Sequence, residues 1–345
     1  MIFQENISLA QYTTFKIGGS ARFFCLVASI DELKEAFEFA QKKSVPFFVL
    51  GGGSNLLISD EGFHGLVIKM EIRGKKIGDR SQKLEVATVS AGAGEMWDEF
   101  VEWTLVNGFN GLENLSAIPG TVGAAPVQNI GAYGTEVGQF ISTVHAFDTH
   151  TMKEIELNAR DCHFGYRNSM FKHEKGRYII THVDFALRND GKVNVEYKDL
   201  RNYFNDQVTI TNSQITPLQV REAVIDIRWN KLPDWNTWGT AGSFFKNPIV
   251  TQEKFDELKV KYPGMPSFPE ASGGIKIPLG WILDNVCQLK GVMTGGVGTY
   301  EKQALVIITK PGAKALEVVA FTQDLMKQVK EATGIMIEAE VEWVN

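Results

Sequence analysis

The sequence predicts an α+β protein of two or three domains. The chain has 345 residues, which is more than a single domain usually contains. A capping-box pattern at residues 29–32 opens an amphipathic helix, and the apolar run at residues 46–50 predicts a buried strand. Near the C-terminus, a helical pattern over residues 313–333 precedes a short alternating stretch that is typical of a strand.

Composition and charge exclude several classes of protein. Apolar residues make up 44% of the chain and charged residues 22%, which is ordinary for a globular protein. The net charge of −6 offers no basic surface, so a nucleic-acid partner is not expected. No apolar run reaches the length of a bilayer span, and the N-terminus lacks the features of a secretory signal. Cys25, Cys162 and Cys287 are scattered without metal-type spacing, as are the histidines, so we expect a cytoplasmic protein without a metal site.

The first part of the chain alternates helix and strand and then becomes richer in β-structure. The helix that follows residue 29 has an apolar face made of Leu33, Ala36, Phe37 and Ala40. Residues 66–70 predict another strand. From about residue 84 the pattern favours strands, interrupted by a helix near residues 95–107 that Gly108 can terminate. Strands are predicted from there to about residue 228.

A second unit is predicted to follow a linker at residues 231–239. It contains a helix near residues 252–260, a Pro/Gly-rich stretch at 263–280 and a strand at 304–309. The long helix near residues 313–333 follows, and a final strand at 335–341 carries Glu338 and Glu340 on one face.

Two glycine-rich loops predict a site for a phosphate-containing ligand. Residues 51–55 follow a buried strand, and glycines there let backbone N–H groups converge on an oxyanion. A tight turn explains one such loop equally well. Residues 118–134 form a second loop that combines glycines with hydrogen-bonding side chains and almost no charge, which suits a flavin ring and its pyrophosphate. The loops lack the GxGxxG pattern that opens a helix, so a Rossmann domain is not expected.

Residues 241–248, AGSFFKNP, place Ser243, Lys246 and Asn247 beside two phenylalanines. Polar side chains in such a stretch need partners once the aromatic rings are buried. A catalytic wall would use a hydroxyl, a positive charge and an amide together. The segment alone favours a Gly-Ser turn that leads into an ordinary half-buried strand, so the rest of the chain must decide.

An ordered set of motifs extends along nearly the whole chain. The motifs of the first half are YTTFKIGG at residues 12–19, LGGGSNLL at 50–57, IPGTVG at 118–123, QNIGAYG at 128–134 and FGYRNS at 164–169. The later motifs are KLPD at residues 231–234, AGSFFKNP at 241–248, QALV at 303–306 and EAEV at 338–341. Together they resemble the UDP-N-acetylenolpyruvoylglucosamine reductase (MurB) family. VEYKDL at residues 195–200 resembles the variant in which a tyrosine-bearing loop covers the substrate.

The resemblance implies the FAD-binding fold shared with vanillyl-alcohol oxidase and p-cresol methylhydroxylase, plus a separate α+β substrate-binding domain. The implied boundaries are residues 1–70 with 334–345 for the first FAD-binding subdomain, 71–230 for the second, and 231–333 for the substrate-binding domain. Residues 51–59 contain neither His nor Cys, so non-covalent FAD is expected. The implied FAD contacts are Gly51, Gly52, Gly53, Ser54, Asn55, Leu56, Pro119, Gly120, Thr121, Gly123, Ala124, Gln128, Ile130, Gly131, Tyr133 and Arg228. A strand arginine with a structural partner is an alternative for Arg228.

The implied reaction is the reduction of UDP-N-acetylglucosamine enolpyruvate to UDP-N-acetylmuramate, a step of peptidoglycan precursor synthesis, with NADPH as co-substrate. Arg167 would bind the substrate carboxylate, Glu340 would stabilise an enolate-like species, and Ser243 would protonate its carbon. A surface ion pair is the alternative for Arg167, and a solvated strand face is the alternative for Glu340.

The resemblance also implies a set of contacts to the UDP-sugar: Tyr166, Tyr197, Lys231, Asn247 and Gln303. A linker lysine and a packed tyrosine are the structural alternatives for Lys231 and Tyr197. A monomer is expected, with no membrane partner. An oxidase on the same flavin fold and a non-catalytic nucleotide-sugar binding protein are the competing functions.

Overall fold

The computed structural model describes residues 1–80, 86–205, 215–235, 237–270 and 273–345. Internal contacts divide the chain into two compact units. The first unit contains Met1–Ile7, Ala21–Gly52 and His64–Asn230, and the second contains Ser8–Ser20, Gly53–Phe63 and Lys231–Asn345. Each unit is therefore assembled from segments that are far apart in the sequence. The division into three domains stays a prediction.

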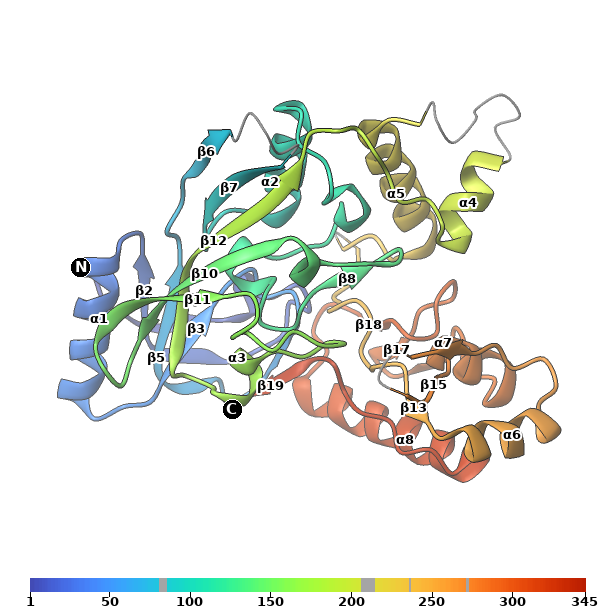
Figure 1. Cartoon of the computed structure of the whole chain (residues 1–345). Coiled ribbons are helices and arrows are strands. Elements are labelled where there is room, and N and C mark those ends of the chain that lie inside the picture. The colour runs from blue at the N-terminus through green and yellow to red at the C-terminus, as the bar shows by residue number, and fades with distance from the viewer. Residues whose placement is uncertain (81–85, 206–214, 236, 271–272) are drawn as a thin grey trace. The chain divides into compact units, whose positions relative to one another are not determined.

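Two sheets form the framework of the first unit (Figure 1). The four-stranded sheet has the order β1-β2-β5-β3, with β1 (Gln4–Ser8), β2 (Ser20–Val27), β3 (Phe47–Leu50) and β5 (Phe63–Met70). The five-stranded sheet has the order β11-β10-β12-β7-β6, with β6 (Lys75–Arg80), β7 (Val86–Gly92), β10 (Ile141–Asp148), β11 (Lys153–Asn158) and β12 (Tyr178–Arg188). The helices of this unit are α1 (Ile30–Lys43), α2 (Trp97–Val106), α3 (Met170–His173), α4 (Lys198–Asn205) and α5 (Pro217–Lys231). A short hairpin joins β8 (Gly131–Ala132) to β9 (Thr135–Glu136).

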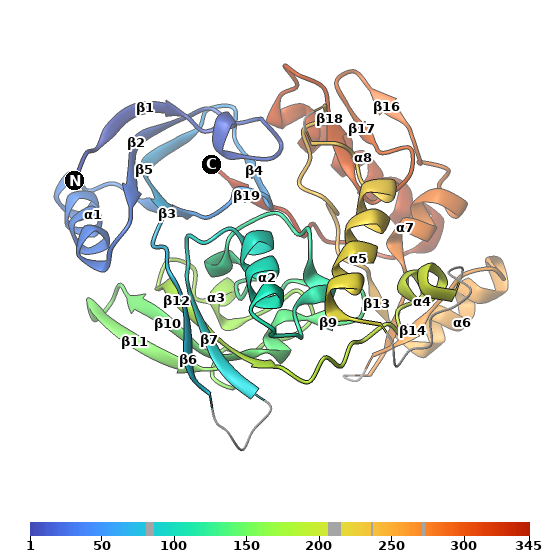
Figure 2. The same ribbon diagram turned by 90° about the horizontal axis from the view of Figure 1, so that it is seen from above.

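Helix α1 begins where the capping-box pattern predicts, with Ser29 as its N-cap, but the Glu32 side chain accepts from Ala28 rather than from Ser29. The Glu32 N–H donates to Ser29 Oγ at 3.2 Å, and the Ala28 N–H donates to Glu32 Oε2 at 2.7 Å. The four predicted apolar residues of the helix are buried. They pack with strand residues of the same unit, and α1 lies along the four-stranded sheet (Figure 2). The helix predicted near residues 95–107 is also confirmed, since α2 ends before Gly108, whose φ is +82°.

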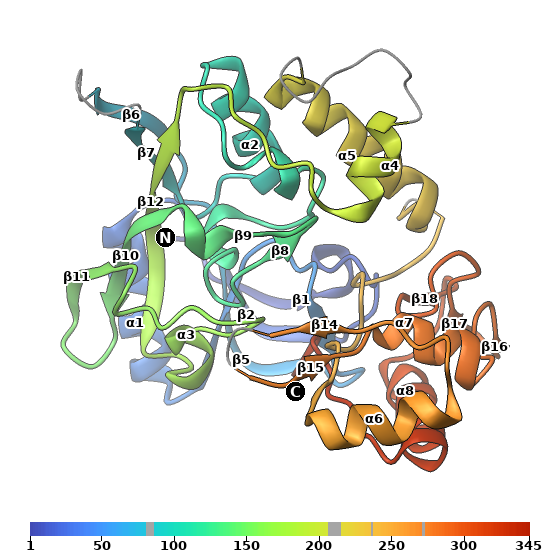
Figure 3. The same ribbon diagram turned by 45° about the vertical axis from the view of Figure 1, so that its right-hand side comes forward.

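The prediction of strands up to about residue 228 is wrong for its last part. Helices α4 and α5 occupy this region and lie beside each other (Figure 3). Thr216 and Gln219 form a capping box, because the Gln219 N–H donates to Thr216 Oγ1 at 3.3 Å and the Thr216 N–H donates to Gln219 Oε1 at 2.8 Å. Pro217 then takes the first helical position, where its missing N–H costs nothing.

Helical spacing therefore outweighs the strand propensity of the β-branched residues in α5. The buried apolar residues of this helix follow helical spacing and pack with residues of α4: Val220, Ala223, Val224 and Ile227. Residues 84–85 and 206–214 of the predicted β-rich stretch lie outside the described residues.

The second unit combines small sheets with two longer helices. One sheet contains β13 (Ile249–Val250), β15 (Ile275–Lys276) and β14 (Phe268–Pro269), and another contains β16 (Met293–Thr294), β17 (Val297–Thr299) and β18 (Ile307–Thr309). The helices are α6 (Gln252–Lys261), α7 (Leu279–Trp281) and α8 (Ala315–Thr333), and α6 and α8 lie side by side in Figures 1 and 3. Strand β4 (Leu56–Ile58) pairs in parallel with β19 (Glu342–Val344).

The C-terminal strand lies later in the sequence than predicted. Residues 335–341 are extended but make only an isolated bridge between Ala339 and Phe245 among the described residues, whereas β19 begins at Glu342. Ile335, Ile337 and Val341 are buried in the core of the second unit, which explains why their alternation resembled a strand. None of the helices that the structure describes has the length and apolar character needed to cross a membrane.

Candidate active site

The two glycine-rich loops pack directly against each other in the first unit. A Cβ added to Gly51 would lie 2.8 Å from Thr121 Oγ1, and one added to Gly52 would lie 2.5 Å from the Cα of Gly120. Any larger residue at position 52 would collide with backbone, so the approach of the loops requires glycine. Two segments about seventy residues apart, residues 51–52 and 118–124, thus form one surface, which we call the cofactor wall. The predicted FAD site requires the two loops to lie together in this way.

Thr121 carries a buried hydroxyl that fits a polar ligand. Its Oγ1 has no hydrogen-bond partner among the described residues, although Thr121 precedes the short 3₁₀ helix Val122–Ala124 and could have capped it. Buried hydroxyls are nearly always paired, because an unpaired one forfeits its hydration. A hydroxyl without a partner, on a wall built from close-packed glycine loops, suits a ligand rich in phosphate and carbonyl oxygens.

Arg167 is held against the second half of the same loop. Its Nη2 donates to the Gly131 carbonyl at 2.8 Å, and its guanidinium lies 5.5 Å from the centre of the Tyr166 ring. The backbone of Arg167 has a φ of +50°, and its tight turn is tied down by Asn129, whose Nδ2 donates to the Gly165 carbonyl at 3.0 Å. The structure therefore brings a predicted catalytic residue and a predicted FAD contact together.

Tyr133, Tyr197 and Arg228 form a neighbouring cluster. The rings of Tyr133 and Tyr197 meet edge to face at 5.5 Å between centroids. Burial raises the pKa of Tyr133 to about 12, with the positive charge of Arg228 opposing that shift. Burial has the opposite effect on the basic side chain of Arg228 and lowers its pKa. The Nε of Arg228 donates to the Ala117 carbonyl at 3.1 Å. Arg228 lies on helix α5, which corrects its assignment to a strand.

Ser243 and Glu340 lie on adjacent extended segments of the second unit. Ser243 bridges Val306 on one side, and the Phe244 carbonyl accepts the Glu340 N–H at 2.8 Å on the other. The side chain of Ser243 is exposed and that of Glu340 is partly buried. Arg167 belongs to the first unit, so the convergence of all three residues stays a prediction.

The predicted substrate contacts of the second unit are partly engaged by local backbone. Asn247 Oδ1 accepts the Leu279 N–H at 2.9 Å, and Gln303 Oε1 accepts the Leu305 N–H at 3.4 Å. Lys231 is exposed at the end of α5. Lys246, considered as a local positive charge, forms an ion pair with Glu338 at 3.0 Å. Among the described residues, no cluster of His, Cys, Asp or Glu could hold a metal ion.

Thr14 is the residue whose position sequence reasoning missed. Its N–H donates to the Gly53 carbonyl at 3.1 Å, and its carbonyl accepts the Thr240 N–H at 3.0 Å. It therefore connects the end of the first glycine loop to the segment that carries Ser243. A Cβ at Gly53, whose φ is +64°, would meet the Tyr12 carbonyl oxygen at 1.8 Å. Thr14 lies in the motif at residues 12–19, but the residue types of this motif did not indicate which contacts Thr14 makes.

Asn55 makes a second connection within this unit. Its Nδ2 donates to the Glu340 carbonyl at 3.1 Å, and its own carbonyl accepts the Glu342 N–H at 3.0 Å. A predicted FAD contact thus helps to fix the backbone of a predicted catalytic residue.

Two family models match successive parts of the chain. Residues 21–153 match a family model described as an FAD binding domain, which makes the chain a flavoprotein and confirms the predicted FAD-binding fold. Residues 234–344 match the model for the C-terminal domain of UDP-N-acetylenolpyruvoylglucosamine reductase.

Curated relatives match over nearly the full length. UDP-N-acetylenolpyruvoylglucosamine reductase of Pseudomonas syringae pv. tomato is 40% identical over 98% of this chain and 97% of the relative. That of Neisseria gonorrhoeae is 40% identical over 97% of this chain and 96% of the relative. The crystal structure of the Thermus caldophilus enzyme (MurB) superposes with a TM-score of 0.67 at 25% identity, covering all of both chains. The chain belongs to the UDP-N-acetylenolpyruvoylglucosamine reductase family.

Proposed function

We propose that the chain reduces the enolpyruvyl ether of UDP-N-acetylglucosamine enolpyruvate to the lactyl ether of UDP-N-acetylmuramate, with NADPH as the electron donor. The observation that carries this proposal is the contact of Arg167 with Gly131. It places a fixed positive charge beside the loop that would hold FAD, where a substrate carboxylate must be held for its neighbouring double bond to accept hydride. The names of the full-length relatives supply the substrate class.

The paired glycine loops of the first unit, at residues 51–52 and 118–124, would hold FAD. Thr121 would donate a hydrogen bond from its buried hydroxyl to the cofactor. The close approach of Gly52 to Gly120 would set the shape of the wall. The remaining contacts would come from the other predicted FAD residues. When bound, the flavin would supply the hydride-transfer chemistry that links NADPH to the enolpyruvyl group.

Arg167 would bind the substrate carboxylate through its guanidinium, which presents parallel N–H groups. Glu340 would stabilise the enolate-like charge through a hydrogen bond. Ser243 would then give its hydroxyl proton to the adjacent carbon. A hydroxyl is a weak acid, but the carbanionic carbon is strongly basic, and positioning decides the rate.

Five side chains are the proposed contacts of the UDP-sugar. Tyr166 and Tyr197 would border it in the first unit, and Lys231, Asn247 and Gln303 would contact its diphosphate and sugar in the second. A monomeric, cytoplasmic enzyme is part of this proposal. The three cysteines support the location, because all are free thiols and two of them are buried.

The test is an oxygen-free titration of the purified protein followed by flavin colour. NADPH should bleach the flavin, and UDP-N-acetylglucosamine enolpyruvate should restore the colour in stoichiometric amount. UDP-N-acetylglucosamine, which lacks the double bond, is the control and should restore nothing. Reoxidation by oxygen but not by the enolpyruvyl substrate would indicate an oxidase. A colourless protein that takes up no FAD would indicate a nucleotide-sugar binding protein.

A further inference from the structure

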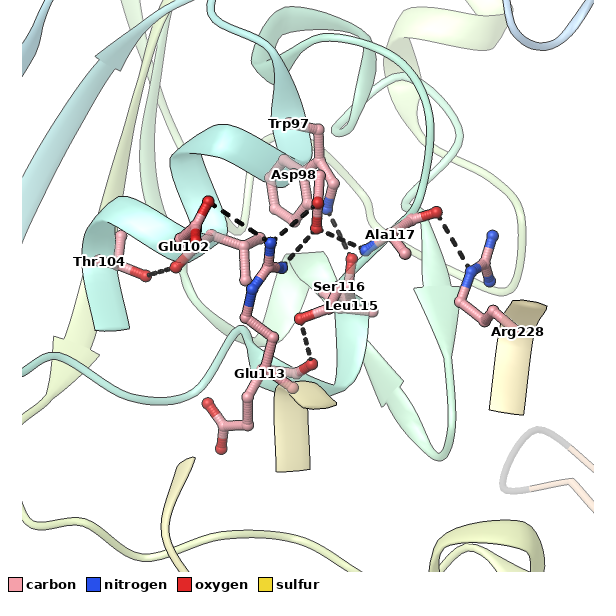
Figure 4. Close-up of polar contacts among 11 residues, drawn as sticks. Trp97, Asp98, Glu102, Thr104, Glu113, Leu115, Ser116, Ala117 and Arg228 are labelled. Atoms are coloured by element: carbon pink, nitrogen blue, oxygen red, sulfur yellow. Dashed lines mark hydrogen bonds and ion pairs between the residues drawn. The ribbon is translucent and has the colours of Figure 1, made fainter. Parts of the chain in front are cut away.

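An ion pair between helices α2 and α5 holds the backbone of Ala117 (Figure 4). Asp98 Oδ1 accepts the Ala117 N–H at 2.5 Å. Arg221 donates to the same carboxylate through Nη1 to Oδ1 at 2.5 Å and through Nη2 to Oδ2 at 2.9 Å. Two parallel bonds from a planar guanidinium fix the orientation of a carboxylate more firmly than one bond can. The side chain of Arg221 is only 9% exposed, so water competes little for these bonds.

The other side of Ala117 is held by the same helix. Arg228 donates its Nε to the Ala117 carbonyl, and it lies seven residues, about two helical turns, after Arg221. Trp97 adds a third attachment, because its Nε1 donates to the Leu115 carbonyl at 2.8 Å (Figure 4). Both polar groups of Ala117 are therefore satisfied by partners on the two helices.

The conformation that is held in this way is an unfavourable one for alanine. The φ of Ala117 is +57°, in the left-handed region where the Cβ of an ordinary residue is crowded. Gly120 follows three residues later, after Ile118 and Pro119, and its Cα leaves no space for a side chain on Gly52. A change of backbone direction at Ala117 would move Gly120 away from, or into, the first glycine loop.

We propose that Asp98 and Arg221 are positioning residues for the cofactor wall. By holding Ala117 in the left-handed conformation, they set the path of residues 118–124 against residues 51–52. Neither side chain needs to touch FAD for this effect. The inference rests on the proposed function, because it takes this wall to be where FAD binds.

The test compares FAD affinity, measured by equilibrium dialysis of the holoprotein with the bound flavin read by absorbance. Asp98→Ala removes the acceptor of the Ala117 N–H and should weaken FAD binding by about tenfold or more, as expected for the loss of a charge-assisted hydrogen bond. The visible circular dichroism of the remaining bound flavin should also change, because the ring would meet a displaced wall. Glu102→Gln is the matched control. Glu102 lies 3.7 Å from Arg221 but makes no contact with Ala117, so FAD affinity should stay as in the wild type.

A second substitution separates positioning from general stability. Glycine adopts a positive φ without crowding, so Ala117→Gly in the Asp98→Ala background should recover at least about threefold of the lost FAD affinity. A merely structural ion pair predicts no such recovery. Arg221→Lys, which keeps the charge but loses the parallel bonds, should weaken FAD binding in the same direction by a smaller factor. It serves if Asp98→Ala does not fold.

The outcomes are distinct. Wild-type FAD affinity in Asp98→Ala and in Arg221→Lys would overturn the positioning role, even if the unfolding temperature fell. An Asp98→Ala loss that Ala117→Gly does not recover would overturn it as well. A wild-type chain that takes up no FAD would instead refute the proposed function on which the inference rests.

Discussion

The predicted site residues of the two units are organised by different means. In the first unit, the cofactor wall is shaped by backbone: Gly52 leaves room for Gly120, and Ala117 is held at a positive φ by two helices. In the second unit, Ser243 and Glu340 project from short extended segments that are joined by a few backbone hydrogen bonds and an isolated bridge. The first arrangement tolerates almost no added atom, whereas the second has an exposed hydroxyl and a partly buried carboxyl.

This difference separates binding from chemistry. A wall made of backbone presents N–H groups in fixed directions and suits a large cofactor that stays bound. Side chains on strand segments can be changed without disturbing the fold, and their effect is confined to the reacting atoms. Substitutions in the backbone-built wall of the first unit should therefore act on FAD affinity, and substitutions of Ser243 and Glu340 on turnover.

The largest expected effect is that of Ser243→Ala on turnover. Loss of the proton donor should slow reduction of the enolpyruvyl substrate by about 100- to 10,000-fold, the usual range for general acid catalysis. NADPH should still bleach the flavin at close to the wild-type rate, because that half-reaction needs no proton from Ser243. Rapid mixing without oxygen measures both halves separately.

Ser267→Ala in the same unit is the control for this substitution, and both half-reactions should keep their wild-type rates. Rapid return of flavin colour when the reduced Ser243→Ala protein meets the substrate would refute the role of Ser243. An equal loss of rate in both half-reactions would contradict a role of Ser243 that is confined to reduction of the substrate.

Gly52→Ala should have the next largest effect, on FAD binding. Its Cβ would lie 2.5 Å from the Cα of Gly120, and neither backbone can yield without moving a loop. We expect FAD affinity to fall by about tenfold or more and the free energy of unfolding to fall by about 1–3 kcal/mol, as for other overpacked sites. Equilibrium dialysis and denaturant unfolding measure the two quantities. Gly264→Ala is the control, since its Cβ would meet Trp281 at an ordinary 3.6 Å. Wild-type FAD affinity in Gly52→Ala would show that the loops do not shape the cofactor site.

The same contrast explains what the sequence could predict. Gly51 and Gly52 could be singled out because glycine reports directly on backbone geometry, and Ser29 and Glu32 because a capping box is local. Helix α5 was mistaken for strand because its β-branched residues were weighed without the capping box of Thr216 and Gln219. That signal was present in the sequence.

The catalytic candidates could not be singled out from residue patterns alone. Exposed Ser243 and a Glu-x-Glu strand look like a solvated face, and only the order of the family motifs distinguished them. The attachment of Ala117 to Asp98 and Arg221 was beyond sequence reasoning for another reason. Asp98 and Arg221 lie 123 positions apart, and no local sequence pattern predicts a positive φ at an alanine.

Thr121→Val should have a smaller effect, with opposite signs in the two ligand states. Without FAD, removal of an unpaired buried hydroxyl should leave the free energy of unfolding unchanged or raise it by about 1 kcal/mol. With FAD, the lost hydrogen bond should weaken binding by about tenfold. Thermal unfolding of the protein with and without FAD measures both effects.

Thr181→Val provides the matched contrast for Thr121→Val. The Thr181 hydroxyl donates to the His145 carbonyl at 3.2 Å, so its loss should destabilise the protein whether or not FAD is bound. If Thr121→Val also destabilised the FAD-free protein, its hydroxyl would have a partner within the chain rather than in the ligand.

The smallest expected effect is a dependence of stability on pH through Asp98. Burial would raise the pKa of Asp98, but hydrogen bonds from Arg221 and from the Ala117 N–H outweigh it and hold the pKa below its usual value. A carboxyl whose pKa is lowered by folding stabilises the protein above its unfolded pKa of about 3.9. That contribution is lost as the pH falls toward the folded pKa. Because the Asp98 side chain is 38% exposed, solvent screening limits the contribution to about 1 kcal/mol or less.

Asp98→Asn should therefore lower the free energy of unfolding at pH 7 and remove part of its decline below about pH 4, as measured by urea unfolding across this range. Glu102→Gln, which changes the other carboxylate near Arg221, should keep the wild-type decline. If Asp98→Asn also kept the wild-type decline, the ion pair would not contribute to the free energy of unfolding. Its only role would then be to fix the backbone conformation of Ala117.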